Sequence, residues 1–376
     1  MTFHFYSPSH FEKWSYKNPL EQGIGGSETA HIECAIRLAK RGNTVYSYSP
    51  LPDDVTPGTS YKGVLWFDLE DADFKDRGIW VMGRAVKELD NFEVEHKGQK
   101  IWLVMQDTMY PTLDEKRAEK LDLFLPLCET HVNHTKNTFP KLSDRIIKSA
   151  NGIRTDIIEE VIKLNKDIVR DPHRMMYASS PDRGLITLLK IFPRIREKIS
   201  NASLHVFYGF DNIEKIVDKN IPIDSLGNTR ADLEYLLDQP GVFWHGRIGQ
   251  RELYIEWLKS GVWAYPTRFS ETSCITSMEA QALGAIPVTN PFWALKDNVM
   301  YGSLIDGDPG LNGLTQTRYI EEIIYQMTRP FVPPLKKGYL QYRRQNSICR
   351  EEMMQEALLR FDWEKVVDQY EQLAKD

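Results

Sequence analysis

The stretch VWAYPTRFSETSCITSMEAQALGAIPVT, residues 262–289, decides the expected fold because three local patterns follow one another in it. VWAYPT and AIPVT are short apolar runs of the kind found in buried strands. Between them, RFSETS is polar and CITSMEAQALG has the spacing of a helix that ends at Gly284. This order of strand, loop, helix and strand is typical of a parallel α/β sheet, where ligands bind beyond the carboxyl ends of the strands.

The same alternation recurs along the chain of 376 residues and predicts an α/β protein with two parallel sheets, one in each of two domains. The Asn-Gly turn at 151–152 and the charged stretch up to residue 172 are expected to join them. The domains would then cover 1–155 and 172–357. The expected strands are FHFYS, TVYSYS, IWVMG, IWLVM and LFLPL in the first domain, and MMYASS, SLHVFYG, VFWHG, VWAYPT and AIPVT in the second.

Composition excludes several classes of protein. A net charge of -6 gives no overall basic field that would recruit nucleic acid or an anionic membrane. The start MTFHFYSPSH has no signal-peptide pattern, and no uncharged run approaches the roughly 18 residues that span a membrane. The four cysteines lie far apart, which indicates neither a zinc site nor a disulfide framework. We therefore expect a soluble cytoplasmic protein that needs no metal.

Two glutamates in the opening stretch are candidates for ligand binding. Glu271 follows a strand and is expected at the rim of the sheet, beside free backbone amides at a helix start. Glu279 lies among apolar residues of the helix, so its carboxylate needs hydrogen-bond donors. A ribose diol would supply them, and an internal Arg or Lys partner is the alternative. The candidate anion cradle consists of the backbone amides of Thr272, Ser273, Cys274 and Ile275.

The glycine-rich segment GIGGSETAHIECAIRLAKRGNTV is a second candidate. It predicts a loop that runs into a helix capped by Ser27. Gly25 and Gly26 allow close approach of a phosphate or sugar, although a plain turn is the alternative reading. Glu28 occupies the third-glycine position of a dinucleotide fingerprint, so that motif is broken.

Positive charge at the phosphates is expected from YASSPDRGLITLLK. Ser180 and Pro181 predict a helix start, and Arg183 beside it could neutralise a diphosphate leaving group. A solvent-exposed arginine is the alternative. Arg247, in HGRIGQREL, also follows a strand and is a second candidate cation.

A polar pair follows the strand IWLVM. Gln106 can hydrogen-bond sugar hydroxyls but cannot act as a base near neutral pH, and Asp107 lies next to it. His131 and His134 are three positions apart and could ligate a metal, but no carboxylate or cysteine pattern accompanies them. We expect them on a solvated helix face.

These motifs resemble family 4 of the retaining GT-B glycosyltransferases. The resemblance rests on Glu271 and Glu279 with seven residues between them, on AQALGAIPV, on the glycine-rich loop followed by KRGNTV, and on SSPDRGL, LHVFYG and HGRIGQREL. It implies two facing Rossmann-like domains, with the final helix, residues 358–376, returning to the N-terminal one. It also implies that the first glutamate contacts the donor sugar and the second the ribose. The sequence departs from the family at Ala178, where an arginine is usual, and at Gln106, where a histidine is usual.

The expected function is that of a retaining, metal-independent hexosyl- or pentosyltransferase without a cofactor. It would move a sugar from a nucleotide-diphosphate donor, a UDP- or GDP-sugar, to an acceptor hydroxyl. Glu271 and Arg183 would be catalytic, and Glu28, Gln106 and Asp107 would lie on the acceptor side. The acceptor stays open among a glycan, a lipid-linked sugar, a small molecule, a protein and a modified DNA base. The alternatives are an inactive sugar-nucleotide-binding protein and an NAD-dependent Rossmann oxidoreductase.

Overall fold

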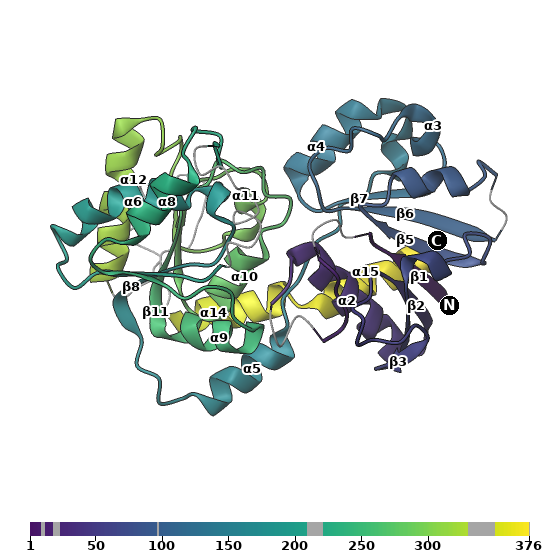
Figure 1. Cartoon of the computed structure of the whole chain (residues 1–376), viewed down its shortest axis with the longest axis horizontal. Helices are drawn as coiled ribbons and strands as arrows, with labels where there is room; N and C mark the ends of the chain where they lie inside the picture. Colours follow the sequence, from purple (N-terminus) through teal and green to yellow (C-terminus); the bar gives the residue numbers. More distant parts are fainter. Residues whose placement is uncertain (9–11, 18–22, 96–97, 209–220, 330–349, 376) are drawn as a thin grey trace. The chain divides into compact units, whose positions relative to one another are not determined.

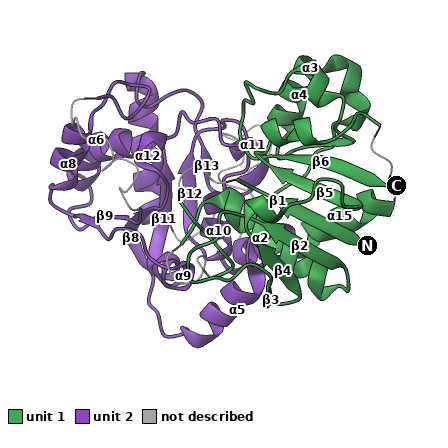
Figure 2. Ribbon diagram, turned by 45° about the vertical axis from the view of Figure 1, so that its right-hand side comes forward, with its two compact units in different colours: residues 1–152, 362–376 green, residues 153–361 purple. Residues whose placement is uncertain are grey.

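The computed structural model describes residues 1–8, 12–17, 23–95, 98–208, 221–329 and 350–375. The chain folds into two compact units, shown in different colours in Figure 2. Unit 1 consists of Met1–Gly152 together with Asp362–Asp376, and unit 2 consists of Ile153–Phe361. Each unit is an α/β fold with its own sheet, as the alternation of strand and helix patterns predicts.

The sheet of unit 1 has the strand order β3-β4-β2-β1-β5-β6-β7. All neighbouring strands are parallel except β3 and β4, which are antiparallel. The strands are β1 (Thr2–Tyr6), β2 (Thr44–Tyr48), β3 (Thr59–Tyr61), β4 (Val64–Phe67), β5 (Gly78–Gly83), β6 (Gln99–Met105) and β7 (Leu123–Pro126). The helices are α2 (Gly26–Lys40), α3 (Glu115–Ala118), α4 (Glu129–Thr138) and α15 (Trp363–Lys375), with 3-10 turns η1 (Leu69–Asp71), η2 (Lys87–Asn91) and η3 (Pro140–Arg145).

The C-terminal helix α15 packs against α2, far from it in sequence, and the two are labelled close together in Figure 1. Asp362 caps α15, because its Oδ1 accepts the backbone N–H of Glu364 at 2.9 Å. Arg41 then donates to the carboxylates of Glu364 at 2.5 Å and Asp368 at 2.7 Å, and to Glu371 at 3.1 Å. The last helix is thus held to the first unit both by an apolar face and by a network of charges.

The sheet of unit 2 has the order β10-β9-β8-β11-β12-β13, and every neighbouring pair is parallel. The strands are β8 (Asp171–Tyr177), β9 (Ser203–Val206), β10 (Val242–Trp244), β11 (Ser260–Tyr265), β12 (Ile286–Thr289) and β13 (Ser303–Leu304). The helices are α5 (Thr155–Leu164), α6 (Leu185–Arg196), α8 (Arg230–Leu237), α9 (Gln250–Lys259), α10 (Ile275–Ala282), α11 (Leu295–Asn298), α12 (Gly313–Thr328) and α14 (Arg350–Arg360), with the 3-10 turn η4 (Pro181–Arg183).

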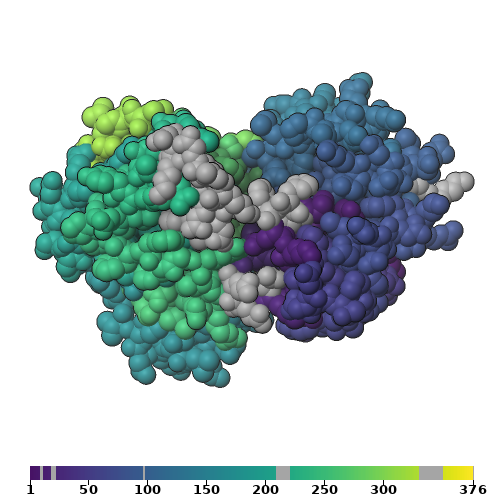
Figure 3. Space-filling model, in the orientation of Figure 1, coloured from purple at the N-terminus to yellow at the C-terminus, as the bar shows by residue number. Residues whose placement is uncertain are grey.

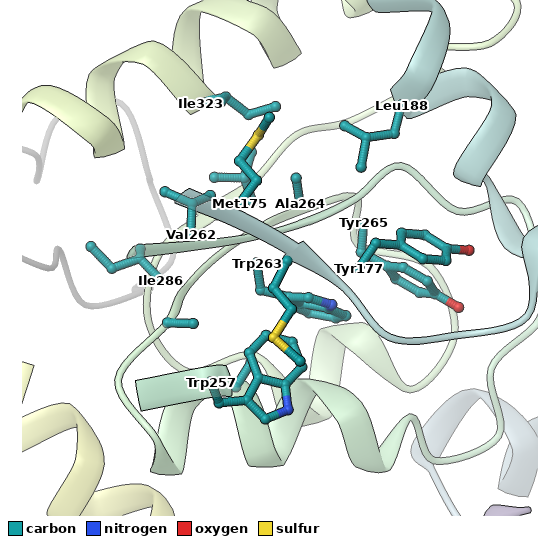
Figure 4. Close-up of a cluster of buried hydrophobic side chains, with 14 of the residues drawn as sticks. Met175, Tyr177, Leu188, Trp257, Val262, Trp263, Ala264, Tyr265, Ile286 and Ile323 are labelled. Carbon is teal, nitrogen blue, oxygen red and sulfur yellow. The ribbon is translucent and has the colours of Figure 1, made fainter. Parts of the chain in front are cut away.

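Strand β11 forms the centre of the unit 2 core, and all six of its residues are buried. Its side chains alternate, so that Val262 and Ala264 face one layer of helices, while Trp263 and Tyr265 face the other (Figure 4). Burial on both faces is what a parallel strand covered by helices requires. Helix α12 packs on this sheet with its inner face and forms part of the surface with its outer face, which is yellow-green in Figure 3.

All ten expected strands are present, whereas β3, β4 and β13 were not predicted. The stretch expected to link the domains contains helix α5, which packs against α9 and buries Ile158 and Val161. Within the described part of the chain, no helix is long and apolar enough to cross a membrane.

Candidate functional site

Two loops at the carboxyl ends of β8 and β11 meet in unit 2. Ser180 is the N-cap residue and Pro181 the first residue of η4, as predicted, but this 3-10 turn has three residues, and Gly184 separates it from α6. Gly184 has a φ of 107°, and a Cβ on it would lie 2.1 Å from the carbonyl oxygen of Pro266. Only glycine fits this contact, and the close approach brings Arg183 against the loop that carries Glu271.

Arg183 and Glu271 form an ion pair in this loop cluster. Nη1 of Arg183 lies 3.0 Å from Oε1 and 3.3 Å from Oε2 of Glu271. The hydroxyl of Tyr265 donates to the same Oε1 at 2.5 Å, and the guanidinium lies 4.0 Å from the centre of the Phe269 ring. Glu271 lies in the loop beyond the carboxyl end of β11, at the edge of the sheet where it was predicted, but it is only 5% exposed. The carboxylate is buried because an arginine and a tyrosine satisfy it.

Burial and charge set the protonation states of this cluster. Burial alone would lower the pKa of Arg183, but Glu271 and the nearby tyrosines raise it above its usual value. Burial, followed by the charge of Glu271, raises the pKa of Tyr265 well above its ordinary range. Tyr265 therefore keeps its proton and donates it in the hydrogen bond. Figure 4 shows the rings of Tyr177 and Tyr265 side by side, with ring centres 5.6 Å apart.

Backbone donors lie next to this ion pair, at the start of α10. The amides of Ser273, Cys274 and Ile275 have no acceptor among the described residues. Cys274 has a φ of 52°, the left-handed conformation, and the buried hydroxyl of Ser273 has no partner within the same part of the chain. Three of the four amides of the expected cradle are thus available, while Thr272 has other interactions. Binding of an anion by these groups stays a prediction.

Glu279 is buried about one turn into α10 and is held by neutral donors. The hydroxyl of Tyr254 and the side-chain amide of Gln250 both donate to its Oε1 at 2.9 Å. Gln250 in turn accepts from Arg154 at 2.5 Å. Burial raises the pKa of Glu279 to about 7, although these hydrogen bonds and the charge of Arg154 act against the rise. Internal partners are therefore present, but they are neutral side chains and not the Arg or Lys of the alternative interpretation.

The remaining cationic candidate of unit 2 lies elsewhere. Arg247 is exposed in the loop between β10 and α9. Ala178, at the position where the family has an arginine, contributes only its carbonyl oxygen, which accepts from the hydroxyl of Thr276 at 3.3 Å. That Arg247 replaces the missing cation stays a prediction.

In unit 1, the glycine-rich segment forms the start of α2. Gly25 is the N-cap residue and Gly26 the first helical residue, so the expectation that Ser27 caps this helix is wrong. The hydroxyl of Ser27 instead donates to Oε2 of Glu28 at 2.8 Å. A Cβ on Gly25 would lie 2.2 Å from that same oxygen. Glycine is therefore needed at position 25 so that the carboxylate of Glu28 can fold back against the helix start.

Glu28 and Asp107 are brought together by an arginine that sequence reasoning missed. Nη1 of Arg84 lies 3.4 Å from Glu28, and its Nε lies 2.9 Å from Asp107. Arg84 follows β5 directly and has a φ of 62°, an unfavourable conformation for a side chain of this size. Its position after a strand was the available signal. Gln106 pairs with Asn151 through two amide hydrogen bonds of 3.2 Å.

The two histidines of α4 differ in burial. His131 is fully buried, so our prediction of a solvated helix face is wrong for it, whereas His134 is exposed. Burial lowers the pKa of His131 to about 4, which keeps its ring neutral at ordinary pH. Across the described ranges, no group of three or more His, Cys, Asp or Glu side chains is arranged to hold a metal ion.

Comparison with known proteins identifies the fold. No family model matches the chain, and the search of curated proteins also finds no match. Solved structures do match over nearly the whole length. Sucrose-phosphate synthase from Thermosynechococcus elongatus has a TM-score of 0.65 at 13% identity, covering 99% of this chain and 98% of its own.

The fold is GT-B. Starch synthase IV from Arabidopsis thaliana, bound to ADP and acarbose, matches with a TM-score of 0.60 at 12% identity, covering 100% of this chain and 98% of its own. Anabaena HepE, in complex with UDP and glucose, has a TM-score of 0.61 at 11% identity, covering 100% of this chain and 99% of its own. At such low identity the likeness establishes the architecture, and the chemistry must be argued from the residues of this chain.

Proposed function

We propose that the protein is a retaining glycosyltransferase that transfers a sugar from a nucleotide-diphosphate donor to an acceptor hydroxyl. The supporting observation is the combination of the GT-B fold with the Arg183–Glu271 pair and the unbonded amides at the start of α10. These groups lie beyond the carboxyl ends of β8 and β11, where parallel α/β sheets bind ligands. Both a diphosphate and a polyhydroxyl sugar can be bound by such a set of donors and acceptors.

Arg183 would stabilise the departing diphosphate. In the free protein, Glu271 occupies Nη1 of Arg183, while the buried Nε has no hydrogen-bond partner among the described residues. A phosphate oxygen would bind this cation and the amides of Ser273 to Ile275 together. Glu271, relieved of part of its pairing, would accept hydrogen bonds from the donor sugar.

Glu279 would hold the ribose of the donor. In the free protein its known donors, Tyr254 and Gln250, both reach the same oxygen, Oε1. A vicinal diol offers two further hydroxyl donors to a carboxylate. Because those bonds favour the ionised form, donor binding would lower the raised pKa of Glu279 and release a proton.

The reaction needs no side-chain nucleophile in this proposal. The bond between the anomeric carbon and the phosphate oxygen breaks, and the acceptor oxygen forms its bond to the same face of that carbon. The acceptor proton passes to an oxygen of the leaving diphosphate. Stabilising the charge on that group is then the main contribution of the protein, and removing one such donor typically costs about 3 to 4 kcal/mol in activation free energy.

Nucleotide binding tests the donor assignment. Thermal unfolding is measured with UDP, GDP, ADP and NAD for the wild type, for Glu279→Gln and for the control Glu252→Gln, whose side chain is exposed on the neighbouring α9. One nucleoside diphosphate should stabilise the wild type and the control but not Glu279→Gln. Stabilisation by NAD alone would favour the oxidoreductase alternative, and an equal response of Glu279→Gln would remove the ribose role.

Turnover tests catalysis. Release of nucleoside diphosphate from its sugar conjugate is followed for Arg183→Ala and for the control Arg194→Ala, which removes an exposed arginine of α6. Arg183→Ala should slow turnover about 100- to 1000-fold. Because the substitution also leaves the buried Glu271 without its arginine partner, turnover is compared at a temperature well below the melting temperature of the variant. A stable wild type that binds the donor yet never cleaves it would support the inactive binding protein instead.

A further inference from the structure

Tyr265, the last residue of β11, is held in place from several sides. Its ring is buried, stacks on that of Trp263 with ring centres 5.0 Å apart, and lies beside that of Tyr177 (Figure 4). Its backbone N–H donates to the hydroxyl of Tyr319 at 2.8 Å, and its carbonyl accepts from the hydroxyl of Thr289 at 2.6 Å. Neither the ring nor the backbone can move without breaking these contacts, so the phenol oxygen occupies a fixed position.

The Tyr265 hydroxyl has two hydrogen-bonding neighbours, and its single proton decides how they are bonded. Oε1 of Glu271 lies 2.5 Å from the phenol oxygen, and Oγ of Ser179 lies 3.3 Å from it. An ionised carboxylate has no hydrogen to donate, so the phenol donates to Glu271 and accepts from the serine. The three side chains thus form a chain of hydrogen bonds directed toward the carboxylate, in which each bond strengthens the next.

The carboxylate of Glu271 is bonded to two side chains that differ in exposure. Among the residues that the structure describes, only Arg183 and Tyr265 donate side-chain hydrogen bonds to it. The side chain of Arg183 is 32% exposed, whereas that of Glu271 is 7% exposed. A ligand that comes from solvent therefore reaches the guanidinium before it reaches the carboxylate.

Binding of a phosphate to Arg183 would take one of these donors away from Glu271. Removing one partner of a buried ion pair normally leaves an uncompensated charge, which is strongly unfavourable. The hydrogen bond from Tyr265 does not involve the guanidinium, so it can persist when a ligand occupies the arginine. It also leaves Oε2 of Glu271, which receives only the 3.3 Å bond from Arg183, available to another donor.

We propose that Tyr265 is a positioning residue, which keeps Glu271 in place and hydrogen-bonded while the diphosphate of the donor takes over Arg183. This inference rests on the proposed function, because it concerns how the same site passes an arginine from its own glutamate to the ligand. Phenylalanine at position 265 would keep the ring contacts and lose only the hydrogen bonds. The role therefore belongs to the phenol oxygen and can be tested by removing that one atom.

Binding of nucleoside diphosphates to the full-length chain tests this role. Dissociation constants for UDP, GDP and ADP are measured by titration calorimetry. The nucleotide that the wild type binds should bind to Tyr265→Phe at least about tenfold more weakly, because Glu271 then has no donor left once phosphate occupies Arg183. Tyr301→Phe is the matched control and should bind like the wild type. It also removes a buried tyrosine–glutamate hydrogen bond, to Glu356, but it precedes β13 and so lies at the amino ends of the strands.

A double-mutant cycle separates positioning from general damage to the fold. On a Glu271→Gln background there is no charge to hold, so adding Tyr265→Phe should change the dissociation constant by less than about threefold. A purely structural role of Tyr265 would give the same loss on both backgrounds. All titrations are run below the melting temperature of the least stable variant. Should Tyr265→Phe not fold, Ser179→Ala takes its place, with an expected loss of about threefold that is absent on the Glu271→Gln background.

The same titrations distinguish failure of this inference from failure of the proposed function. If the wild type binds a nucleoside diphosphate but Tyr265→Phe binds it equally well, Tyr265 has no positioning role and the donor assignment stands. The same conclusion follows if the loss is equal on the Glu271→Gln background. If the wild type binds none of the three nucleotides, the transferase proposal fails and the role of Tyr265 fails with it.

Discussion

Replacing Glu279 with glutamine should change how the stability of unit 2 depends on pH. Burial raises the pKa of Glu279 to about 7, compared with 4.5 for the unperturbed carboxyl. At pH values between 4.5 and 7, the carboxyl group of Glu279 is protonated in the folded chain and ionised in the unfolded chain. The contribution of Glu279 to the free energy of unfolding therefore falls as pH rises from 4.5 to 7. Above pH 7 the destabilisation by its ionised carboxylate stays constant.

The size of this effect follows from the two pKa values. A difference of 2.5 units corresponds to about 3 kcal/mol at neutral pH, as an order of magnitude for a fully buried group. Glutamine has no proton to lose and can still accept from Tyr254. The difference in free energy of unfolding between Glu279→Gln and the wild type should thus rise by about 3 kcal/mol in favour of the variant between pH 4.5 and 7.5. This corresponds to roughly 6 to 12 °C in melting temperature for a unit of this size.

Calorimetric melting at several pH values between 4.5 and 8 measures this difference. Glu252→Gln, whose side chain is exposed on α9, is the control and should follow the wild type throughout. Titration of other groups cancels because only differences between variants are compared. A constant difference across this range, or a wild type that gains on the variant as pH rises, would show that Arg154 and the neutral donors fully compensate the carboxylate.

Two further predictions concern the fold. Gly184→Ala should destabilise unit 2 by at least about 2 kcal/mol, because its φ is 107° and the added Cβ would overlap the carbonyl of Pro266. Gly227→Ala, with a φ of 77° but open space around it, should cost only about 1 kcal/mol in chemical unfolding, and equal losses would refute the role of the overlap. Arg41→Ala should cost about 1 to 2 kcal/mol by loosening α15, measured as faster proteolysis of the C-terminus at low salt. The exposed Lys40→Ala is its control, and a protease-resistant Arg41→Ala would contradict the expectation.

The strands and the division into two parallel sheets could be predicted because their signals are local, whereas the GT-B architecture was predicted from the resemblance of the motifs to a known family. Apolar runs such as VWAYPT alternate with helical patterns. A parallel strand that is buried on both faces consists of consecutive apolar residues, which makes it easy to recognise. The strands β3 and β13 escaped prediction since they have three and two residues, too few to show a pattern.

The partners within the site could not be predicted, because they depend on contacts distant in sequence. Arg183 and Glu271 were both identified as candidates, but their pairing depends on Gly184 lying against Pro266. Tyr254 and Gln250 were not among the candidates, because they reach Glu279 only through the packing of α9 beside α10. Residue types therefore indicated candidate residues, while the structure shows which of these residues pair with one another.

The return of α15 to unit 1 means that unit 2 is inserted into the chain of unit 1. During synthesis, all of unit 2, Ile153–Phe361, is therefore made before α15, the last helix of unit 1. Loss of Asp362–Asp376 through a premature stop codon or an exoprotease would expose the apolar residues of unit 1 that Trp363 and Tyr370 cover. Damage to α15 thus weakens a unit whose other elements all come from Met1–Gly152.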